Sequence, residues 1–499
     1  MIQTDLHLSR QFSIGAISPL IFGGFLEHMG RSIYEGVYDP DSAHADGDGM
    51  RKDVLTALAN LGLTIVRYPG GNFASGYHWQ DGVGPREQRP TVRDLAWQSI
   101  ETNEFGTDEF LKLCRKLDWQ PMLAVNLGTG TPEEARNWVE YCNAALGTVY
   151  ADQREANEHP EPYGVRYWCL GNEMDGPWQL GHGSAQQYGS MARQAAKMMK
   201  DLDRKLETVV CGSSAPAMPT YLEWDQSVLE TVGGLGDYIS LHRYVGNSNQ
   251  DTADYLALSN SIDQQIESVD ACCRFVQAKR KSRKRQYLCF DEWNVWYKAR
   301  SPEDMDGRGQ KAPHLVEEVY NLEDALVVAG FLMSFIRHAD SVKIANLAQL
   351  VNVIAPILTR GDECLRQSIY HAFRLFSTRK GGVSLRPSVA GPGYESASYG
   401  FVNYLDCAAS LDSDTSTLHL FLTNRHSAEV MPLKVCHDLG VKSLTSGEIL
   451  TANDAKAANS FDEPNAVAAC AFDAVTIRDN ELVTELPPLS LVALSFAVS

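Results

Sequence analysis

Eight short apolar runs, each followed at once by polar or glycine residues, recur along the first 350 residues of this chain. Runs of this length are typical of strands that are buried on both faces of a parallel sheet. Helix-like segments separate them, and eight strand and helix units are what a closed (β/α)8 barrel requires. We therefore predict a TIM barrel with strands in the segments 19–27, 63–71, 120–128, 165–173, 208–216, 237–244, 286–292 and 341–349.

Amphipathic segments between these runs are predicted to form the helices that cover the barrel. Pro132 after Thr131 marks one helix start, because proline is favoured at the first helical position. A last helix is predicted at 363–376, ahead of the C-terminal part of the chain. The other predicted helices occupy residues 50–60, 107–117, 132–145, 185–206 and 260–280.

After residue 380 the pattern changes to short alternating segments such as TSTLHLFLTNR and LSLVALSFAV, separated by turn-forming residues. This pattern predicts a jelly-roll-like antiparallel β-sandwich. We expect an α/β architecture in which residues 19–378 form the barrel and residues 379–499 the sandwich. Residues 1–18 are expected to supply an N-terminal strand that packs on the sandwich.

The charge balance restricts the class of ligand. Against 44 Lys and Arg the chain has 63 Asp and Glu, a formal net charge of −19, which disfavours nucleic acid and anionic membranes as partners. The N-terminus does not look like a signal peptide, and no stretch approaches 18 uninterrupted apolar residues. We therefore expect a cytoplasmic protein with a neutral or cationic ligand.

Two glutamates stand at the ends of predicted strands: Glu173 in WCLGNEMDG and Glu292 in LCFDEWNVW. The carboxyl ends of barrel strands surround one mouth, so these side chains should meet there. Paired carboxylates in a cleft for a neutral ligand cleave glycosidic bonds, one donating a proton and the other attacking or stabilising the anomeric carbon. Polar and aromatic residues at the other run ends suit a saccharide.

Several strings together carry a resemblance to a known family. FGGFLEHMGRSIYEGVYDP, RYPGGNF, GNEMDGPWQ, LHRY, FDEWNVWY and EEVYNLEDAL, in this order, resemble the α-L-arabinofuranosidases of glycoside hydrolase family 51. The Asn-Glu pair is shared by a wider clan of retaining barrel glycosidases, whereas GGFLEH and RYPGGN are specific to the family. The resemblance covers residues 19–350, and the C-terminal region has the length and texture of the family's sandwich.

The resemblance implies that Glu173 is the general acid/base and Glu292 the nucleophile of a retaining mechanism. A retaining enzyme should hold the two carboxyl groups about 5–5.5 Å apart, and an inverting one about 6.5–9.5 Å. No cofactor and no metal are implied, and a homo-oligomer, such as a hexamer, is expected. The predicted substrate-binding residues are Glu27, Arg67, Asn72, Trp97, Asn172, His242, Tyr244, Trp296 and Gln349, of which His242 alone rests on its place at a strand end rather than on the resemblance.

The sequence thus predicts an exo-acting enzyme that releases terminal α-L-arabinofuranosyl residues from arabino-oligosaccharides or arabinoxylan fragments. A β-xylosidase or an endo-β-glucanase remains an alternative, since the catalytic pair does not specify the sugar. A binding protein without catalysis and a metal-dependent isomerase are more remote alternatives. Loop 39–49 is acidic and is expected to shape the mouth rather than to bind an ion, and segment 298–320 is expected to be a mobile flap.

Overall fold

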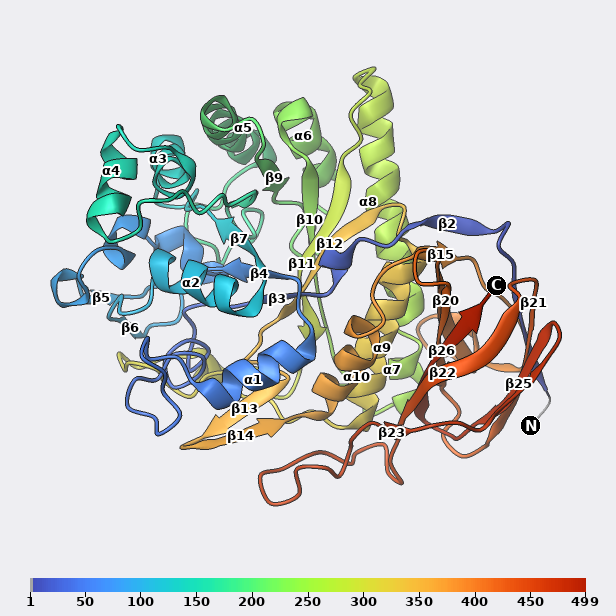
Figure 1. Cartoon of the computed structure of the whole chain (residues 1–499). Helices are drawn as coiled ribbons and strands as arrows, with labels where there is room; N and C mark the ends of the chain where they lie inside the picture. The colour runs from blue at the N-terminus through green and yellow to red at the C-terminus, as the bar shows by residue number, and fades with distance from the viewer. Residues whose placement is uncertain (1–2) are drawn as a thin grey trace.

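The computed structural model describes residues 3–499 and has a closed barrel of eight parallel strands beside two further large sheets (Figure 1). Each barrel strand overlaps one of the eight predicted runs, so the predicted (β/α)8 fold is confirmed. The barrel strands are β3 (Gly23–Phe25), β4 (Ile65–Tyr68), β7 (Gln120–Ala124), β8 (Tyr167–Leu170), β9 (Glu207–Val210), β10 (Tyr238–Val245), β11 (Tyr287–Val295) and β12 (Val342–Ala348).

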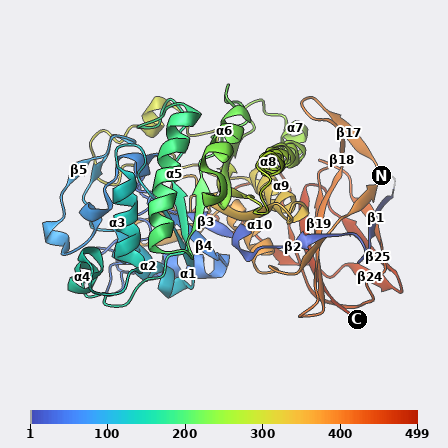
Figure 2. The ribbon, with the colours of Figure 1, turned by 90° about the horizontal axis from the view of Figure 1, so that it is seen from above.

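Helices cover the outside of the barrel, and α3, α5, α6 and α8 lie side by side in Figure 2. The predicted start of α3 is confirmed, because the Thr131 side chain accepts a hydrogen bond from the backbone N–H of Glu134. No helix within residues 3–499 is long and apolar enough to cross a membrane. The helices are α1 (Lys52–Leu61), α2 (Thr107–Leu117), α3 (Pro132–Asn143), α4 (Val149–Ala156), α5 (Ala185–Leu202), α6 (Glu223–Val232), α7 (Thr252–Leu256), α8 (Ser259–Lys279), α9 (Leu322–Arg337) and α10 (Ser368–Ser377).

The helix predicted at 363–376 is wrong in its first turn. Residues Glu363–Arg366 form strand β14, which pairs antiparallel with β13 (Ile357–Arg360). Gly361 and Asp362 form the two-residue turn, and Gly361 has φ of +54°, a conformation that glycine adopts without strain. Turn chemistry therefore outweighs the helical pattern here, and α10 begins only at Ser368.

The C-terminal part of the chain forms two sheets that bury one apolar core between them. The seven-stranded sheet runs β2-β15-β19-β20-β26-β22-β23, and the five-stranded sheet runs β16-β1-β21-β25-β24. The N-terminal strands join both: β1 (Thr4–Leu8) pairs parallel with β21, and β2 (Ser13–Ala16) pairs antiparallel with β15. The other strands are β15 (Val383–Leu385), β16 (Ser388–Ala390), β19 (Leu405–Asp412), β20 (Thr417–Asn424), β21 (Met431–His437), β22 (Val441–Leu450), β23 (Cys470–Ala471), β24 (Val475–Arg478), β25 (Glu481–Leu486) and β26 (Ser490–Val498).

The outer face of the seven-stranded sheet packs against helices α9 and α10 of the barrel. Phe376 of α10 stacks on Phe421 of β20 with ring centroids 4.2 Å apart, and both rings are fully buried. The barrel core therefore continues into the sandwich. Two small hairpins complete the fold, β5 (Val92–Arg93) with β6 (Ile100–Glu101) and β17 (Gly393–Ser396) with β18 (Gly400–Asn403).

Candidate active site

The two glutamates meet at the mouth of the barrel. Glu173 lies just beyond the carboxyl end of β8, and Glu292 lies near the carboxyl end of β11. A carboxylate oxygen of Glu173, one of Glu292 and a ring nitrogen of His242 all lie within 4.8 Å of one another. Glu292 is 5% exposed, so its electrostatic interactions are weakly screened by water, whereas Glu173 is more open to solvent.

Both oxygens of Glu292 are held by donors from other strands. Arg67 of β4 donates from Nη1 to Oε1 at 2.6 Å, and the Tyr244 hydroxyl of β10 donates to Oε2 at 2.8 Å. Burial disfavours the charged form of Arg67, but the charges of Asp291 and Glu292 outweigh it and raise the pKa of Arg67 well above its ordinary value. A permanent cation therefore fixes the orientation of Glu292.

Glu173 accepts one hydrogen bond on each oxygen. His242 Nδ1 lies 2.8 Å from Oε1, and Trp178 Nε1 donates to Oε2 at 2.6 Å. The backbone of Glu173 has φ of +45°, and its carbonyl closes a turn with the N–H of Gly176 at 2.8 Å. This conformation is uncommon for a residue with a side chain and occurs here beside the predicted chemistry, as strained residues often do.

His242 lies between three carboxylates. Besides Glu173, it faces Glu292, with Nδ1 3.6 Å from Oε2, and Asp291, with Nε2 3.3 Å from Oδ1. Burial by itself lowers the pKa of His242, but the charges of Glu292 and Asp291 outweigh burial and raise that pKa well above 6.5. Both ring nitrogens are thus directed at acidic groups.

Glu27 lies at the end of β3 and is buried. The backbone N–H of Phe73 and the indole N–H of Trp97 donate to its Oε1 at 2.9 and 3.0 Å, and Gln349 Nε2 lies 3.3 Å from Oε2. Burial, and after it the charge of Glu292, raises the pKa of Glu27 to about 8. Glu27 is therefore mostly protonated at neutral pH and offers a donor as well as acceptors.

The remaining predicted residues join the same network. Asn172 accepts from Arg67 Nη2 at 2.8 Å and donates to Asn72 Oδ1 at 3.3 Å. Trp296 packs edge-to-face on Tyr244, with ring centroids 5.4 Å apart. The structure therefore brings together all eleven predicted site residues, namely Glu27, Arg67, Asn72, Trp97, Asn172, Glu173, His242, Tyr244, Glu292, Trp296 and Gln349, and their individual roles stay predictions.

Asp291 is a buried site residue that the sequence did not single out. It lies 3.4 Å from Arg67 Nε and 3.3 Å from His242 Nε2. Adjacent residues of a regular strand point to opposite faces, so Asp291 and Glu292 should not share a site. A bulge in β11 breaks this alternation: three steps along β11 oppose two along β10, from Ser240 to His242.

The two loops singled out by the sequence are tied to the barrel. In loop 39–49, Asp46 and Asp48 form ion pairs with Lys116 and Lys112 of α2. Segment 298–320 forms backbone hydrogen bonds to the β5–β6 hairpin region, with Gly307 N–H donating to Trp97 O at 2.8 Å. The mobility of this segment and ion binding by the acidic loop stay predictions.

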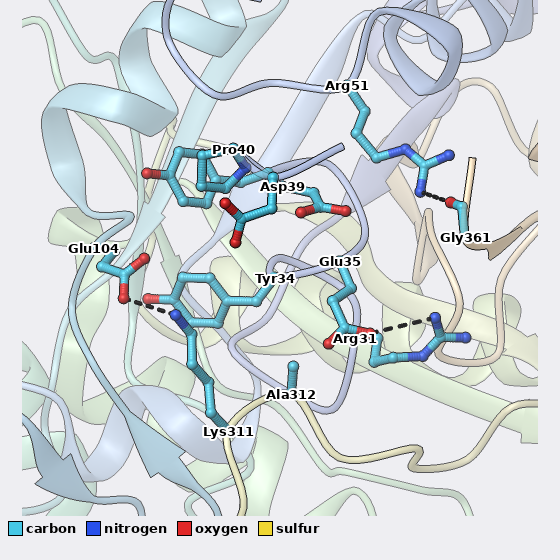
Figure 3. A pocket seen from close by; sticks show the side chains of 12 residues that line it. Arg31, Tyr34, Glu35, Asp39, Pro40, Arg51, Glu104, Lys311, Ala312 and Gly361 are labelled. Carbon is cyan, nitrogen blue, oxygen red and sulfur yellow. Dashed lines mark hydrogen bonds and ion pairs between the residues drawn. The ribbon is translucent and has the colours of Figure 1, made fainter. Parts of the chain in front are cut away.

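A separate pocket of about 560 Å³ is lined by residues of several loops, and neither Glu173 nor Glu292 lines it (Figure 3). Its cations are compensated within or beside the pocket. Lys311 pairs with Glu104 at 2.6 Å, and Arg31 pairs with Glu317 at 2.8 Å. Both of these cations of the pocket are thus paired with a carboxylate.

Two family models match the chain. Residues 57–264 match the "Alpha-L-arabinofuranosidase 1 domain", and residues 291–490 match the "Alpha-L-arabinofuranosidase C-terminal domain". The intracellular exo-α-(1→5)-L-arabinofuranosidase 1 of Bacillus subtilis is 43% identical over 491 residues, which are 98% of each chain. The exo-α-(1→6)-L-arabinofuranosidase of Bifidobacterium longum is 38% identical over 98% of this chain and 97% of its own.

Solved structures agree with these relatives. A family 51 α-L-arabinofuranosidase from Bifidobacterium longum superposes with a TM-score of 0.94 at 35% identity and covers 99% of both chains. The α-L-arabinofuranosidase of Thermotoga maritima, solved as an arabinose complex, gives 0.89 at 34% identity, also over 99% of both chains. The matches extend over barrel and sandwich alike, and the chain belongs to the α-L-arabinofuranosidases of glycoside hydrolase family 51.

Proposed function

We propose that this exo-α-L-arabinofuranosidase acts by retaining double displacement on terminal, non-reducing α-L-arabinofuranosyl residues of arabino-oligosaccharides or arabinoxylan fragments. The observation that carries the mechanism is the closeness of the two carboxylates, which have oxygens within 4.8 Å of each other. A separation of about 5–5.5 Å between carboxyl groups suits direct attack, whereas an inverting enzyme needs about 6.5–9.5 Å to admit a water molecule.

In the first displacement Glu292 attacks the anomeric carbon while Glu173 protonates the departing oxygen. Arg67 and Tyr244 hold the attacking carboxylate from both sides. Because Glu173 Oε1 is hydrogen-bonded to His242 Nδ1, the other oxygen, Oε2, is the one that delivers the proton. Trp178 bonds to Oε2 in the free enzyme and is half exposed, so the glycosidic oxygen would take its place.

In the second displacement Glu173, now anionic, deprotonates a water molecule. The water oxygen attacks the anomeric carbon of the arabinosyl ester and releases Glu292. Arabinose leaves with the configuration it had in the substrate. The polar groups around Glu27 and Asn172 are proposed to bind the furanose hydroxyls, with Trp97 and Trp296 as the walls of the sugar site.

The linkage and the cellular setting belong to the proposal as well. Relatives named for (1→5) and for (1→6) bonds match at 43% and 38% identity, so the linkage needs a direct comparison of disaccharides. Several relatives are named intracellular, which favours a cytoplasmic enzyme that hydrolyses oligosaccharides after their uptake.

The proposal includes a homo-oligomer. Size-exclusion chromatography with light scattering should then give a molar mass that is a multiple of the 55.2 kDa of one chain.

The mechanism is tested with Glu292→Ala and Glu173→Ala on 4-nitrophenyl α-L-arabinofuranoside. Azide should restore turnover of both variants. With Glu292→Ala it replaces the missing carboxylate as the nucleophile and gives the inverted arabinosyl azide. With Glu173→Ala it replaces water in the second displacement and gives the retained arabinosyl azide. Wild-type turnover by Glu292→Ala would refute the nucleophile role. Faster hydrolysis of aryl β-xylosides or β-glucosides than of the arabinofuranoside would favour the alternative activities.

A further inference from the structure

His242 is placed between the two catalytic glutamates rather than beside one of them. Its Nδ1 lies 2.8 Å from Glu173 Oε1 and 3.6 Å from Glu292 Oε2, and the side chain is buried. Arg67, the other cation of the site, forms an ion pair with Glu292 but none with Glu173. Of the residues that the structure describes, His242 is the cationic side chain within ion-pair distance of both glutamates.

The surroundings of His242 favour its charged form. Only an imidazolium has an N–H on both ring nitrogens, and each nitrogen here faces a carboxylate, Nε2 facing Asp291 at 3.3 Å. The charged or titratable groups around it are Glu173 from the loop after β8, Asp291 and Glu292 from β11, and, one contact further, Arg67 of β4. Asp291 and Arg67 are both almost completely buried, so these charges are weakly screened.

The proposed mechanism moves one negative charge across this site. Before the first displacement Glu292 is the anion and Glu173 carries the proton. The attack forms the bond from Glu292 to the anomeric carbon, breaks the glycosidic bond and transfers the proton of Glu173 to the leaving oxygen, so Glu173 becomes the anion. In the second displacement the water oxygen forms a bond to the anomeric carbon, a proton of that water passes to Glu173, and the electron pair of the ester bond returns to Glu292.

We propose that His242, held by Asp291, is the counter-ion that the two glutamates share in turn. It faces anionic Glu292 in the free enzyme and anionic Glu173 in the arabinosyl-enzyme, and it keeps its own proton throughout. The negative charge that passes from Glu292 to Glu173 then lies beside the same cation at every stage, so the polar groups of the site need not reorient during the reaction. Asp291 is in this view a positioning residue that acts through His242. The inference rests on the double displacement proposed above.

The test is the pH dependence of His242→Gln, in which a neutral amide replaces the imidazolium. The acid limb of kcat/KM reports Glu292 in the free enzyme. With 4-nitrophenyl α-L-arabinofuranoside, whose activated leaving group makes the second step limiting, the acid limb of kcat reports Glu173 in the arabinosyl-enzyme. Loss of a shared cation should move both limbs to higher pH, each by about one unit.

Other outcomes overturn the proposal. Movement of one limb alone would assign His242 to a single glutamate, and a raised KM with both limbs unmoved would make it a sugar contact. His242→Asn serves as a second variant if His242→Gln fails to fold, which circular dichroism checks. His338→Gln is the matched control, because His338 also faces an aspartate, Asp263 at 3.2 Å, but lies at the end of α9.

The wild-type enzyme separates this inference from the mechanism on which it rests. Rapid quenching and mass spectrometry should detect an arabinosyl ester on Glu292 of the wild type. Absence of that ester would refute the double displacement itself. If the ester forms on the wild type but the acid limbs of kcat and kcat/KM do not shift together in His242→Gln, only the shared counter-ion is refuted.

Discussion

Arg67 and Glu292 form an ion pair of 2.6 Å across the inside of the barrel, although 225 positions separate them in the chain. Their strands, β4 and β11, are not neighbours, because β12 and β3 lie between them in the barrel order. The pair therefore forms only when the barrel closes, so the fold and the orientation of the Glu292 carboxylate are established together.

Replacing Arg67 with methionine should destabilise the protein by about 3–5 kcal/mol, because Glu292 and Asp291 would remain buried without their cation. Urea unfolding at pH 7 measures this change. Arg67→Lys should lose less stability, since it keeps the charge but not the second bond to Asn172. Equal stability of wild type and Arg67→Met would contradict the role given to the pair.

Tyr244→Phe should lower kcat/KM, which contains the attack by Glu292, roughly tenfold or more, because a hydrogen bond to a charged group contributes about 1.5–3 kcal/mol. The hydroxyl lies 2.8 Å from Glu292 Oε2, whereas the ring, which packs on Trp296, is kept. Steady-state kinetics on an aryl arabinofuranoside measures the effect. An unchanged kcat/KM would show that this bond does not orient Glu292 for attack.

Glu27→Gln should remove a pH dependence of stability. The pKa of Glu27 is raised to about 8 in the folded state by burial, so the proton is held more tightly there than in the unfolded chain, where the pKa is near 4.5. Its contribution to stability is therefore complete below pH 4.5 and is lost as the pH rises through about 8.

The difference in unfolding free energy between wild type and Glu27→Gln should fall by on the order of 1 kcal/mol per pH unit across this window. Urea unfolding of both proteins at pH 5, 6, 7 and 8 checks it. Parallel curves for the two proteins would mean that Glu27 titrates normally.

Glu318→Ala should loosen segment 298–320. Glu318 is buried, and its Oε1 accepts hydrogen bonds from the backbone N–H groups of Tyr297, Lys298 and Ala299 at 2.8, 2.6 and 3.0 Å. Leaving three donors unpaired should cost about 2–3 kcal/mol of stability and raise KM.

Limited proteolysis with mass mapping should then cut within 298–320 faster than in the wild type. Glu318→Gln keeps an acceptor oxygen at the same position and is the control, with near wild-type cleavage expected. Identical cleavage of all three proteins would show that Glu318 does not anchor the segment.

Some failures of prediction have definite physical causes. Residues 363–366 lie in a segment that suits a helix, but the Gly361–Asp362 turn pairs them with β13 instead. Asp291 was not predicted as a site residue, because regular strand alternation would direct it away from Glu292, whereas the bulge in β11 brings both side chains to one site. A bulge depends on the register with both neighbouring strands, which no local pattern records.

The sequence by itself determined the number and order of the barrel strands, the C-terminal sheets and the two glutamates at strand ends. These features follow from local periodicity and residue chemistry, which depend only on residues that are close in the sequence. Only the tertiary structure decided that His242 lies between Glu173 and Glu292, and that Asp291 contacts both His242 and Arg67. Those distances join residues from four separate strands or loops, and they are set by closure of the barrel and the bulge in β11.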